Sequence, residues 1–315
     1  MSENYLVTGG AGFIGSNIVR ALVEKGAKVR IIDNLSTGKI KNIADLLDQV
    51  EFVNGDIRYI HTVMEHMKGI DYVLHQAALP SVPRSIEIPF ESNDNNTNGT
   101  LNILIAAKEN KVKRVVYAGS SSAYGDSPSL PKVETMTPNP LSPYAVNKLT
   151  GEYYCTVFSK VYGLETVTLR YFNVFGPRQD PTSYYSAVIP KFIKAIREHK
   201  SPTIFGDGEQ SRDFSYIENV VEANLLACRA QNVSGEVFNI ACGERLSVNK
   251  LFSQLKEILA TDIKAEYLPP RTGDVKHSLA DISKAKKMLG YQIKVPVSDG
   301  VRRTVDWFTK VDKSG

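Results

Sequence analysis

The first half of the chain alternates short β-branched runs with longer segments of helical periodicity. Parallel strands need a crossover between them, usually a helix, so this alternation predicts a mostly parallel, doubly wound sheet. The predicted strands cover residues 5–8, 28–33, 51–54, 72–75, 114–118 and 165–170. An amphipathic segment over 87–110 and a well-marked helix over 143–162 follow the fourth and fifth of these strands. The sequence therefore predicts the α/β fold class.

After about residue 175 this rhythm breaks at a turn-rich cluster, and a second such cluster lies at 268–273. Helical patterns near 187–198, 216–230, 247–258 and 298–309 are separated by short strands. We expect a Rossmann-like doubly wound domain over residues 1–175 and a smaller C-terminal α/β lobe over 176–315, segments of which can cross back to the first domain.

Composition excludes several classes of protein. The 315 residues carry a net charge of +4 and no basic run longer than two residues, which argues against a nucleic-acid partner. No apolar stretch approaches the roughly 20 residues that span a bilayer, and the start shows no secretory signal. Cys155, Cys228 and Cys242 form no CxxC pair, and no His/Cys spacing suggests a metal. These features predict free thiols and a cytoplasmic location.

Residues 8–15 read TGGAGFIG and lie between a predicted strand and an apolar helix. Gly9, Gly12 and Gly15 serve either a tight strand-to-helix turn or a backbone cradle for a pyrophosphate at the helix N-terminus. Asp33 ends the second strand 18 residues after Gly15, where a carboxylate meets the adenosine ribose 2′-hydroxyl. A carboxylate there repels a 2′-phosphate, so the pattern favours NAD over NADP. Asp33 could instead cap a turn with Asn34.

Two further segments fit the same site. Asp56-Ile57 follows the third strand and could contact the adenine, and His75-Gln76-Ala77-Ala78 follows the fourth. The small side chains of Ala77 and Ala78 would let a cofactor lie close to the backbone. We interpret His75 as a packed strand-end histidine rather than a ligand.

Tyr144 and Lys148 stand four residues apart on the helix over 143–162, so their side chains share one face. Ser142 and Gly163 are suited to cap this helix. A tyrosine has an ordinary pKa of about 10, and a nearby ammonium is expected to lower it by a unit or more. Just upstream, the fifth strand runs into GSSSAYG. One or two of these serines could share a substrate proton with Tyr144, although three serines could also be a polar turn.

In this order TGGAGFIG with Asp33, HQAA, GSSSAYG, PYAVNK, RYFNVFGPRQ and RDFSYIENV resemble the extended short-chain dehydrogenase/reductases. Within them the chain is most similar to the NAD-dependent UDP-hexose 4-epimerases, in particular the UDP-N-acetylglucosamine 4-epimerase branch. The resemblance covers nearly the whole chain. It implies an isomerase that oxidises C4 of the sugar, lets the 4-keto sugar turn, and reduces it on the other face.

The resemblance also implies residue roles. Tyr144 is the base for the 4-hydroxyl, Lys148 tunes it and binds the nicotinamide ribose, and Ser120 bridges the 4-oxygen, with Ser121 or Ser122 as alternatives. The implied cofactor site comprises Gly9, Gly12, Phe13, Ile14, Gly15, Asp33, Asn34, Ser36, Thr37, Gly38, Asp56, Ile57, Gln76, Ala77, Ala78, Asn96, Tyr144, Lys148 and Tyr171. The implied UDP-sugar site comprises Ser81, Arg84, Ser120, Asn173, Val188, Lys191, Phe205, Arg212, Arg271, Asp274 and Ser278.

Within the implied UDP-sugar site, Arg212 and Arg271 match diphosphate-binding arginines, and Phe205 could pack against uracil. The alternative for Arg212 is a surface ion pair with Asp213. The resemblance further implies a homodimer, for which the helices at 87–110 and 143–162 are candidates.

Several related activities use the same scaffold. The serine loop has no Asp-Glu pair, which argues against a dehydratase. Arg84 could receive a sugar carboxylate, so a UDP-glucuronate 4-epimerase or decarboxylase remains the alternative. Ser278 matches a position that is bulky in glucose-restricted epimerases, and a small residue there leaves room for an acetamido group. We therefore predict UDP-GlcNAc/UDP-GalNAc interconversion, with UDP-Glc/UDP-Gal as a second pair. An NAD-sensing regulator would have no use for Tyr144 and Lys148.

Overall fold

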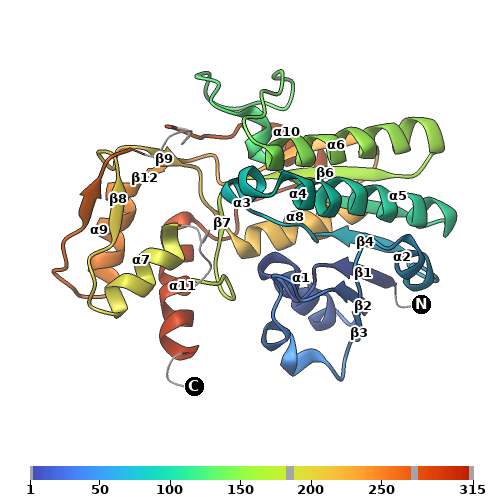
Figure 1. The fold of residues 1–315 in the computed structure, drawn as a ribbon, viewed down its shortest axis with the longest axis horizontal. Helices are drawn as coiled ribbons and strands as arrows, with labels where there is room; N and C mark the ends of the chain where they lie inside the picture. The colour runs from blue at the N-terminus through green and yellow to red at the C-terminus, as the bar shows by residue number, and fades with distance from the viewer. Residues whose placement is uncertain (1–2, 182–187, 271–275, 312–315) are drawn as a thin grey trace.

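The computed structural model describes residues 3–181, 188–270 and 276–311. Its centre is a seven-stranded parallel sheet in the order β11-β6-β5-β4-β1-β2-β3 (Figure 1). The strands are β1 (Asn4–Thr8), β2 (Lys28–Asp33), β3 (Glu51–Asn54), β4 (Tyr72–His75), β5 (Arg114–Ser120), β6 (Thr166–Tyr171) and β11 (Glu236–Ile240). The predicted doubly wound Rossmann-like sheet is confirmed, and its six predicted strands agree with the observed ones to within two residues.

Helices cover both faces of this sheet because its strands are apolar on both sides. Leu6 belongs to one hydrophobic cluster and its neighbours Tyr5 and Val7 to another, as the two-residue period of a strand requires. One face packs against α2 (Ile60–His66), α5 (Gly99–Glu109) and α6 (Pro143–Tyr162). The other packs against α1 (Phe13–Glu24) and α8 (Ile217–Arg229).

The second part of the chain forms a smaller group of elements beside the sheet, on the left of Figure 1. It contains the helices α7 (Val188–Arg197), α9 (Val248–Ile258) and α11 (Val297–Val311) and the strand pairs β8 (Thr203–Phe205) with β13 (Glu266–Leu268) and β9 (Ser211–Arg212) with β12 (Leu246–Ser247). A third pair joins β7 (Val174–Phe175) to β10 (Ser215–Tyr216). Strand β11 and helices α8 and α10 (Ser283–Leu289) return to the central sheet. The division at 175/176 stays a prediction.

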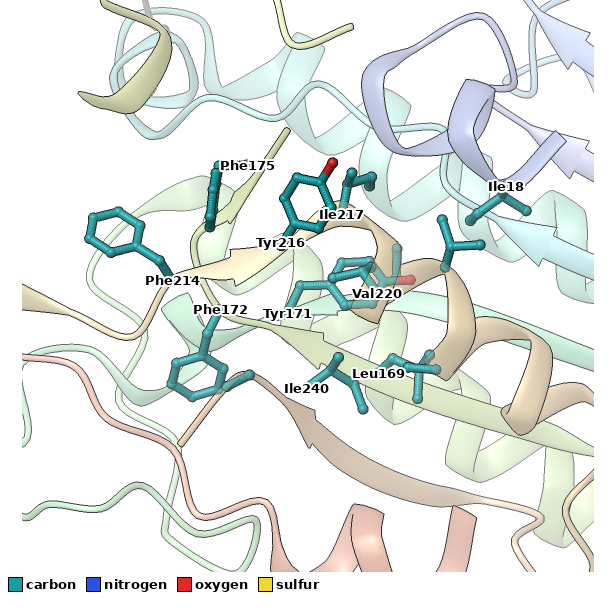
Figure 2. Close-up of a cluster of buried hydrophobic side chains, with 14 of the residues drawn as sticks. Ile18, Leu169, Tyr171, Phe172, Phe175, Phe214, Tyr216, Ile217, Val220 and Ile240 are labelled. Carbon is teal, nitrogen blue, oxygen red and sulfur yellow. The ribbon is translucent and has the colours of Figure 1, made fainter. Parts of the chain in front are cut away.

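An aromatic cluster joins the two parts where β6 leaves the sheet (Figure 2). The Phe175 ring meets the Phe214 ring edge-on with centroids 6.1 Å apart, and the Tyr216 ring at 5.7 Å. Tyr171 and Phe172 belong to the same buried cluster. Aromatic rings bury large apolar areas, so this contact holds the second part against the sheet without a flexible linker.

The helix that carries Tyr144 begins and ends where its sequence predicts. The Ser142 hydroxyl accepts a hydrogen bond from the Ala145 amide at 3.2 Å, Pro143 occupies the first turn, and Gly163 ends the helix with a φ of +70°. The expected helix over 87–110 is instead divided into α4 (Pro89–Asn93), a π-helical turn (Asp94–Asn98) and α5. Asn96 in that turn is buried, and its side chain binds the backbone of Leu79. Helical periodicity in the sequence carries no information about this contact, so it predicted one continuous helix where the structure has a π-helical turn.

The remaining short elements are α3 (Val82–Glu87) and the 3₁₀ turns Ile40–Asn42, Ala44–Leu46 and Ser121–Tyr124. Within the described residues, no helix combines the length and apolarity that a membrane span requires.

Candidate active site

The glycine turn between β1 and α1 is shaped by two kinds of glycine. Gly9 has a φ of +68°, and a Cβ there would lie 2.8 Å from the backbone of Ala77. A Cβ on Gly15 would lie 2.1 Å from the Gly9 carbonyl oxygen. A Cβ on Gly12 would meet only that oxygen, at 3.1 Å. Packing of the chain itself therefore requires Gly9 and Gly15, whereas the space beside Gly12 is open to a ligand.

A cavity of about 980 Å³ lies at the carboxyl ends of β1, β2 and β4. Its lining includes many predicted cofactor residues, namely Gly9, Gly12, Phe13, Ile14, Gly15, Asp33, Asn34, Ser36, Thr37, Ile57, Gln76, Ala77 and Ala78. Ser81 and Arg84, predicted for the sugar, line it too. Lys39 and Asp180, which sequence reasoning missed, also line it, and their side chains form an ion pair with a Nζ–Oδ2 distance of 2.5 Å. This pair links the loop after β2 to the loop after β7.

Asp33 lies in this cavity wall with little exposure. Its carboxylate accepts hydrogen bonds from the Ala11 amide at 2.9 Å and the Leu35 amide at 2.8 Å. Burial raises the pKa of Asp33, and these two amides oppose that shift. A Cβ on Gly38 would lie 2.7 Å from the carboxylate, so Gly38 leaves room for it. The turn-capping role and a place in the cavity wall therefore occur together.

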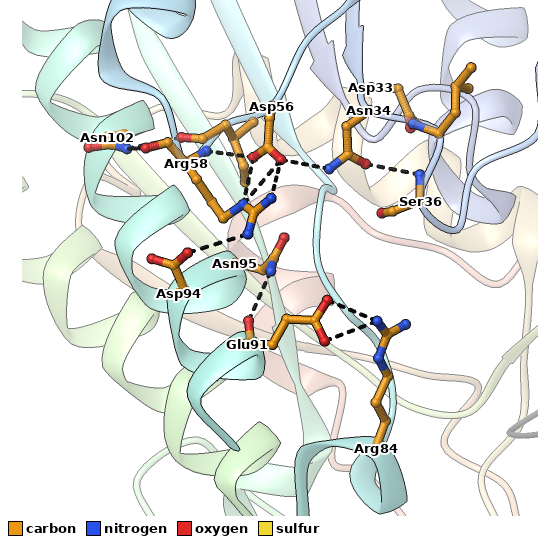
Figure 3. A network of polar contacts seen from close by, with 12 residues as sticks. Asp33, Asn34, Ser36, Asp56, Arg58, Arg84, Glu91, Asp94, Asn95 and Asn102 are labelled. Atoms are coloured by element: carbon orange, nitrogen blue, oxygen red, sulfur yellow. Dashed lines mark hydrogen bonds and ion pairs between the residues drawn. The ribbon is translucent and has the colours of Figure 1, made fainter. Parts of the chain in front are cut away.

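Asp56 is held by an arginine that the sequence analysis missed (Figure 3). The Arg58 guanidinium lies 2.7 Å from the Asp56 carboxylate, and Asn34 donates to it at 3.0 Å. Burial opposes ionisation of Asp56, but the hydrogen bonds from Arg58 and Asn34 and the charge of Arg58 together outweigh it, so the pKa of Asp56 is lowered. Asp56 thereby fixes the side chain of Asn34, which lines the cavity. Asp56 itself does not line the cavity.

The predicted catalytic residues come together at the end of β5. Burial raises the pKa of Tyr144, and a hydrogen bond with Ser120 opposes that shift. The Ser120 hydroxyl also accepts from the Ser122 hydroxyl at 2.8 Å and the Ser122 amide at 3.2 Å. Lys148 is buried, and its ammonium donates to the Ala118 carbonyl at 2.9 Å. Ser120 is thus the serine that meets Tyr144, and Ser122 orients it.

The expected lowering of the tyrosine pKa is wrong for this structure. Burial dominates at Tyr144, and burial also lowers the pKa of Lys148 to about 8. The Lys148 ammonium is bound to a backbone carbonyl of β5 rather than directed at the phenol. The four-residue spacing predicted that Tyr144 and Lys148 share one helix face, but it carries no information about how deeply the two side chains are buried.

His75 is a packed residue, as interpreted from the sequence. Its two ring nitrogens lie 2.7 Å from the Thr8 hydroxyl and 3.0 Å from the Thr100 hydroxyl. Because Thr100 donates to the Asn96 carbonyl, it accepts from His75, so the imidazole carries its proton on Nε2. Burial lowers the pKa of His75 to about 3, so the ring is neutral at physiological pH.

Two other predicted cofactor residues support the cavity from behind. The Tyr171 hydroxyl lies 3.2 Å from the Gln76 amide nitrogen and 2.8 Å from that of Asn224. Asn224, on α8, was not singled out by the sequence. Asn96 binds both the amide and the carbonyl of Leu79, which lines the cavity.

A second cavity of about 600 Å³ lies between α7 and β8. The predicted substrate residues in its wall are Asn173, Val188, Lys191, Phe205 and Arg212. Pro181 lines both cavities, so the two are neighbours. Ser278 lies beside Asn173, whose amide donates to the Ser278 hydroxyl at 3.3 Å. Arg271 and Asp274 lie outside the described residues.

Two arginines of the predicted UDP-sugar site, Arg212 and Arg84, have hydrogen-bond partners within the chain. Asp213 is fully buried, so the surface ion pair between Arg212 and Asp213 is wrong. Arg212 instead donates to the Ser211 and Lys276 carbonyls, each at 3.1 Å. The Arg84 guanidinium contacts both carboxylate oxygens of Glu91, at 3.0 and 3.2 Å (Figure 3). Within the described ranges, no three His, Cys, Asp or Glu side chains gather as a metal site would require.

A Rossmann-type sheet with a glycine turn, an acidic residue ending β2 and a Ser–Tyr–Lys set beside β5 defines a dinucleotide-dependent enzyme of the extended short-chain dehydrogenase/reductase class. The chain belongs to the NAD dependent epimerase/dehydratase family, whose model matches residues 5–241. The family description confirms the predicted cofactor, NAD. The open side of Gly12, the Asp33 carboxylate and the small residues Ala77 and Ala78 in one cavity wall fit that dinucleotide.

Solved structures similar to this chain cover nearly all of it. A UDP-N-acetylglucosamine 4-epimerase from Methanobrevibacter ruminantium M1, in complex with UDP-N-acetylmuramic acid, is 44% identical with a TM-score of 0.94 over 99% of this chain and 100% of that one. A UDP-glucose 4-epimerase from Thermotoga maritima, with UDP-glucose, is 40% identical with a TM-score of 0.93 over 98% and 99%. A UDP-glucuronic acid 4-epimerase from Bacillus cereus, with UDP-glucuronic acid and NAD, is 36% identical with a TM-score of 0.91 over 98% and 99%.

Proposed function

We propose that this protein is an NAD-dependent UDP-hexose 4-epimerase that interconverts UDP-GlcNAc and UDP-GalNAc, with UDP-Glc and UDP-Gal as a second pair. The observation that carries the proposal is the placement of Ser120, Tyr144 and Lys148 at the carboxyl end of β5: Ser120 ends that strand, the Lys148 ammonium donates to the Ala118 carbonyl at 2.9 Å, and Tyr144 lies one helical turn before Lys148. The neighbouring cavity with Arg212 in its wall gives a UDP group a place beside the dinucleotide. A guanidinium suits bidentate contact with a phosphate.

In this proposal each residue has a defined task. Bound NAD supplies a hydride acceptor and donor, and its oxidised ring adds a positive charge that favours a tyrosinate. Tyr144 takes the proton of the 4-hydroxyl and returns it, which requires the phenol oxygen to be within hydrogen-bond reach of that group. Ser120 orients the same oxygen through its hydroxyl, and Lys148 adds a second positive charge below a pH of about 8.

The preference for an N-acetylated sugar rests on Ser278. Its hydroxyl accepts from the side chain of Asn173 and the amide of Asp213. A small side chain held in this way leaves room for an acetamido group on C2. The similarity to a UDP-N-acetylglucosamine 4-epimerase supports the same choice.

A UDP-glucuronate 4-epimerase or decarboxylase is the second candidate, because Arg84 lines the first cavity and a relative acts on UDP-glucuronic acid. The ion pair of Arg84 with Glu91 speaks against it. A sugar carboxylate would have to replace Glu91 as the partner of Arg84.

We also propose a homodimer, as the resemblance implies. The exposed face of α6 carries Val146, Tyr153, Val157 and Val161, and Phe90 on the adjacent α4 is 85% exposed. An apolar face of this extent on two packed helices is typical of a protein–protein contact. The cytoplasmic location stays a prediction.

The testing experiment incubates purified protein separately with UDP-GlcNAc, UDP-glucose and UDP-glucuronate, without added NAD, and follows the sugar by proton NMR. We expect the axial C4 epimer from UDP-GlcNAc and from UDP-glucose, formed faster from UDP-GlcNAc. Tyr144→Phe should lower kcat by about 10³-fold with UDP-sugar binding retained. Turnover of UDP-glucuronate alone would favour the second candidate. Bound NAD with no turnover of any of these sugars would favour an NAD-sensing regulator.

A further inference from the structure

Asp213, between β9 and β10, is a fully buried carboxylate. One carboxylate oxygen accepts from the Cys242 amide at 2.9 Å, and the other accepts from the Gly243 and Ala280 amides, both at 3.1 Å. These contacts join three separate segments of the chain. A buried carboxylate bound to neutral amides carries a desolvation cost that an uncharged residue would avoid. That cost raises the question of what Asp213 holds.

The backbone of Asp213 binds two residues of the predicted sugar site. Its carbonyl accepts from the Asn173 side chain at 2.9 Å, and its amide donates to the Ser278 hydroxyl at 3.4 Å. The Asn173 side chain also donates to Ser278, at 3.3 Å. Asn173 has a φ of +34°, a backbone conformation that costs energy and persists only where neighbours fix it. The three residues therefore form one bonded group.

The segment that begins at Lys276 is hydrogen-bonded to strand β9, which directly precedes Asp213. The Ser278 amide donates to the Ser211 carbonyl at 3.0 Å, and the Ser211 amide donates to the Lys276 carbonyl at 3.0 Å. Arg212 binds the Lys276 carbonyl through its guanidinium. The Asp213 carboxylate then holds this segment at Ala280. The position of Ser278 thus depends on Asp213 in two ways. The Asp213 amide binds the Ser278 hydroxyl, and the Asp213 carboxylate binds the amide of Ala280, two residues further along.

We infer that Asp213 is a positioning residue for substrate selection: it fixes Asn173 and Ser278 relative to each other and thereby sets the preference for the substituent on C2 of the sugar. The inference rests on the proposed function, since it assigns Ser278 to that substituent. Asp213 itself touches neither substrate nor cofactor in this role. Its effect is expected on the KM for the N-acetylated substrate, because the acetamido group is the part of the sugar next to Ser278.

The test compares Asp213→Asn with Arg114→Lys as a matched control. The carboxamide keeps the shape of Asp213 but turns an N–H towards a backbone N–H, so at least one of the three hydrogen bonds is lost. Arg114 is also buried and also binds backbone, the carbonyls of Ala227 and Ala230, but at the amino end of β5. Both variants are therefore expected to lower Tm.

We expect Asp213→Asn to raise the KM for UDP-GlcNAc by about tenfold, the equivalent of one lost hydrogen bond, and that for UDP-glucose by less than about threefold. Arg114→Lys should change both equally. NAD bound per protomer should stay the same in both variants. A lowered Tm with an unchanged ratio of the two kcat/KM values would overturn the inference and leave Asp213 a structural residue.

Ser278→Ala gives a second measurement that does not disturb the buried carboxylate. It keeps a small side chain and removes only the hydroxyl that Asp213 and Asn173 hold. We expect the kcat/KM for UDP-GlcNAc to fall relative to that for UDP-glucose. In the double variant with Asp213→Asn, this ratio should be no lower than in the poorer single variant. An unchanged ratio in Ser278→Ala would overturn the inference. An inactive wild type on UDP-GlcNAc, seen before any variant is made, would refute the proposed substrate and this inference together.

Discussion

At the scale of single residues, the glycine turn separates packing from binding. A Cβ on Gly15 would overlap the Gly9 carbonyl, whereas Gly12 has a φ of −76°, which any residue adopts, and has space beside it. The glycines are equally spaced in the sequence, but packing of the chain requires Gly15, whereas Gly12 leaves space for a ligand.

We expect Gly12→Ala to lose NAD, because the methyl group occupies space that faces the cavity, and to have nearly the Tm of wild type freed of NAD, since bound NAD itself raises Tm. Gly15→Ala should fail to keep the turn and be strongly destabilised. The measurement is Tm together with NAD released from the denatured protein. Equal NAD content in Gly12→Ala and wild type would contradict the assignment of that space.

Lys148 gives a prediction about pH. Its pKa is lowered by burial to about 8, below the ordinary lysine value of about 10.5 in the unfolded chain. Between these values the unfolded chain holds a proton that the folded chain does not, so stability rises with pH. The contribution is lost as pH falls through about 8, where the buried amine must be charged.

In protein freed of nucleotide, urea unfolding of wild type should therefore gain about 2 kcal/mol relative to Lys148→Met between pH 7 and about 9.5. Above that range, Tyr144 titrates in the opposite sense, because its raised pKa makes the folded chain keep a proton longer. A pH-independent difference between the two proteins would show that the amine is not desolvated.

At the scale of elements, α6 is fixed to the sheet by a buried ion pair. Arg170 on β6 contacts Glu152 at 2.5 Å, both side chains being buried, and the guanidinium lies 4.7 Å from the centre of the Tyr124 ring. Glu152 is one helical turn beyond Lys148, and Arg170 pairs in register with Gly119, next to Ser120. The pair thus joins α6, which carries Tyr144 and Lys148, to β6, the neighbour of the strand β5 that ends at Ser120.

Arg170→Met leaves Glu152 as an uncompensated buried charge and should cost about 3–5 kcal/mol of unfolding free energy. A second change, Glu152→Leu, should recover part of that loss, because it removes the uncompensated charge. The exposed pair Arg303–Glu218 is the control, where Arg303→Met should cost less than about 1 kcal/mol. Similar losses at the two sites in urea unfolding would contradict this account.

At the scale of the whole molecule, the apolar face of α6 and α4 predicts the state of association. Val157→Glu should convert a dimer into a monomer, because a charge in the centre of the contact is desolvated without a partner. Leu47→Glu, at an exposed apolar position away from those helices, should leave the dimer intact. Sedimentation velocity distinguishes the two, and a monomeric wild type would contradict the proposed dimer.

The same scale shows what the sequence could and could not predict. Strands such as residues 28–33 and the capped helix at 143–162 are determined by local periodicity and end residues, so their bounds were predicted to the residue. The π-helical turn at 94–98 depends on the distant backbone of Leu79. Asp213 gains its role from Cys242 and Ala280, which only the folded chain brings to it. Local patterns and the family resemblance predicted the catalytic set, which stays a prediction, but neither could predict the long-range contacts that support it.

The ion pair between Lys39 and Asp180 joins two loops that both line the dinucleotide cavity. If the loops must separate before the nucleotide leaves, this bridge would slow its exchange with the surrounding pool. In an isomerase, whose reaction ends with the nucleotide in its starting oxidation state, such a molecule behaves as a prosthetic group. Flux through the enzyme would then be insulated from swings in the cellular NAD⁺/NADH ratio, and would respond to the supply of sugar nucleotide instead.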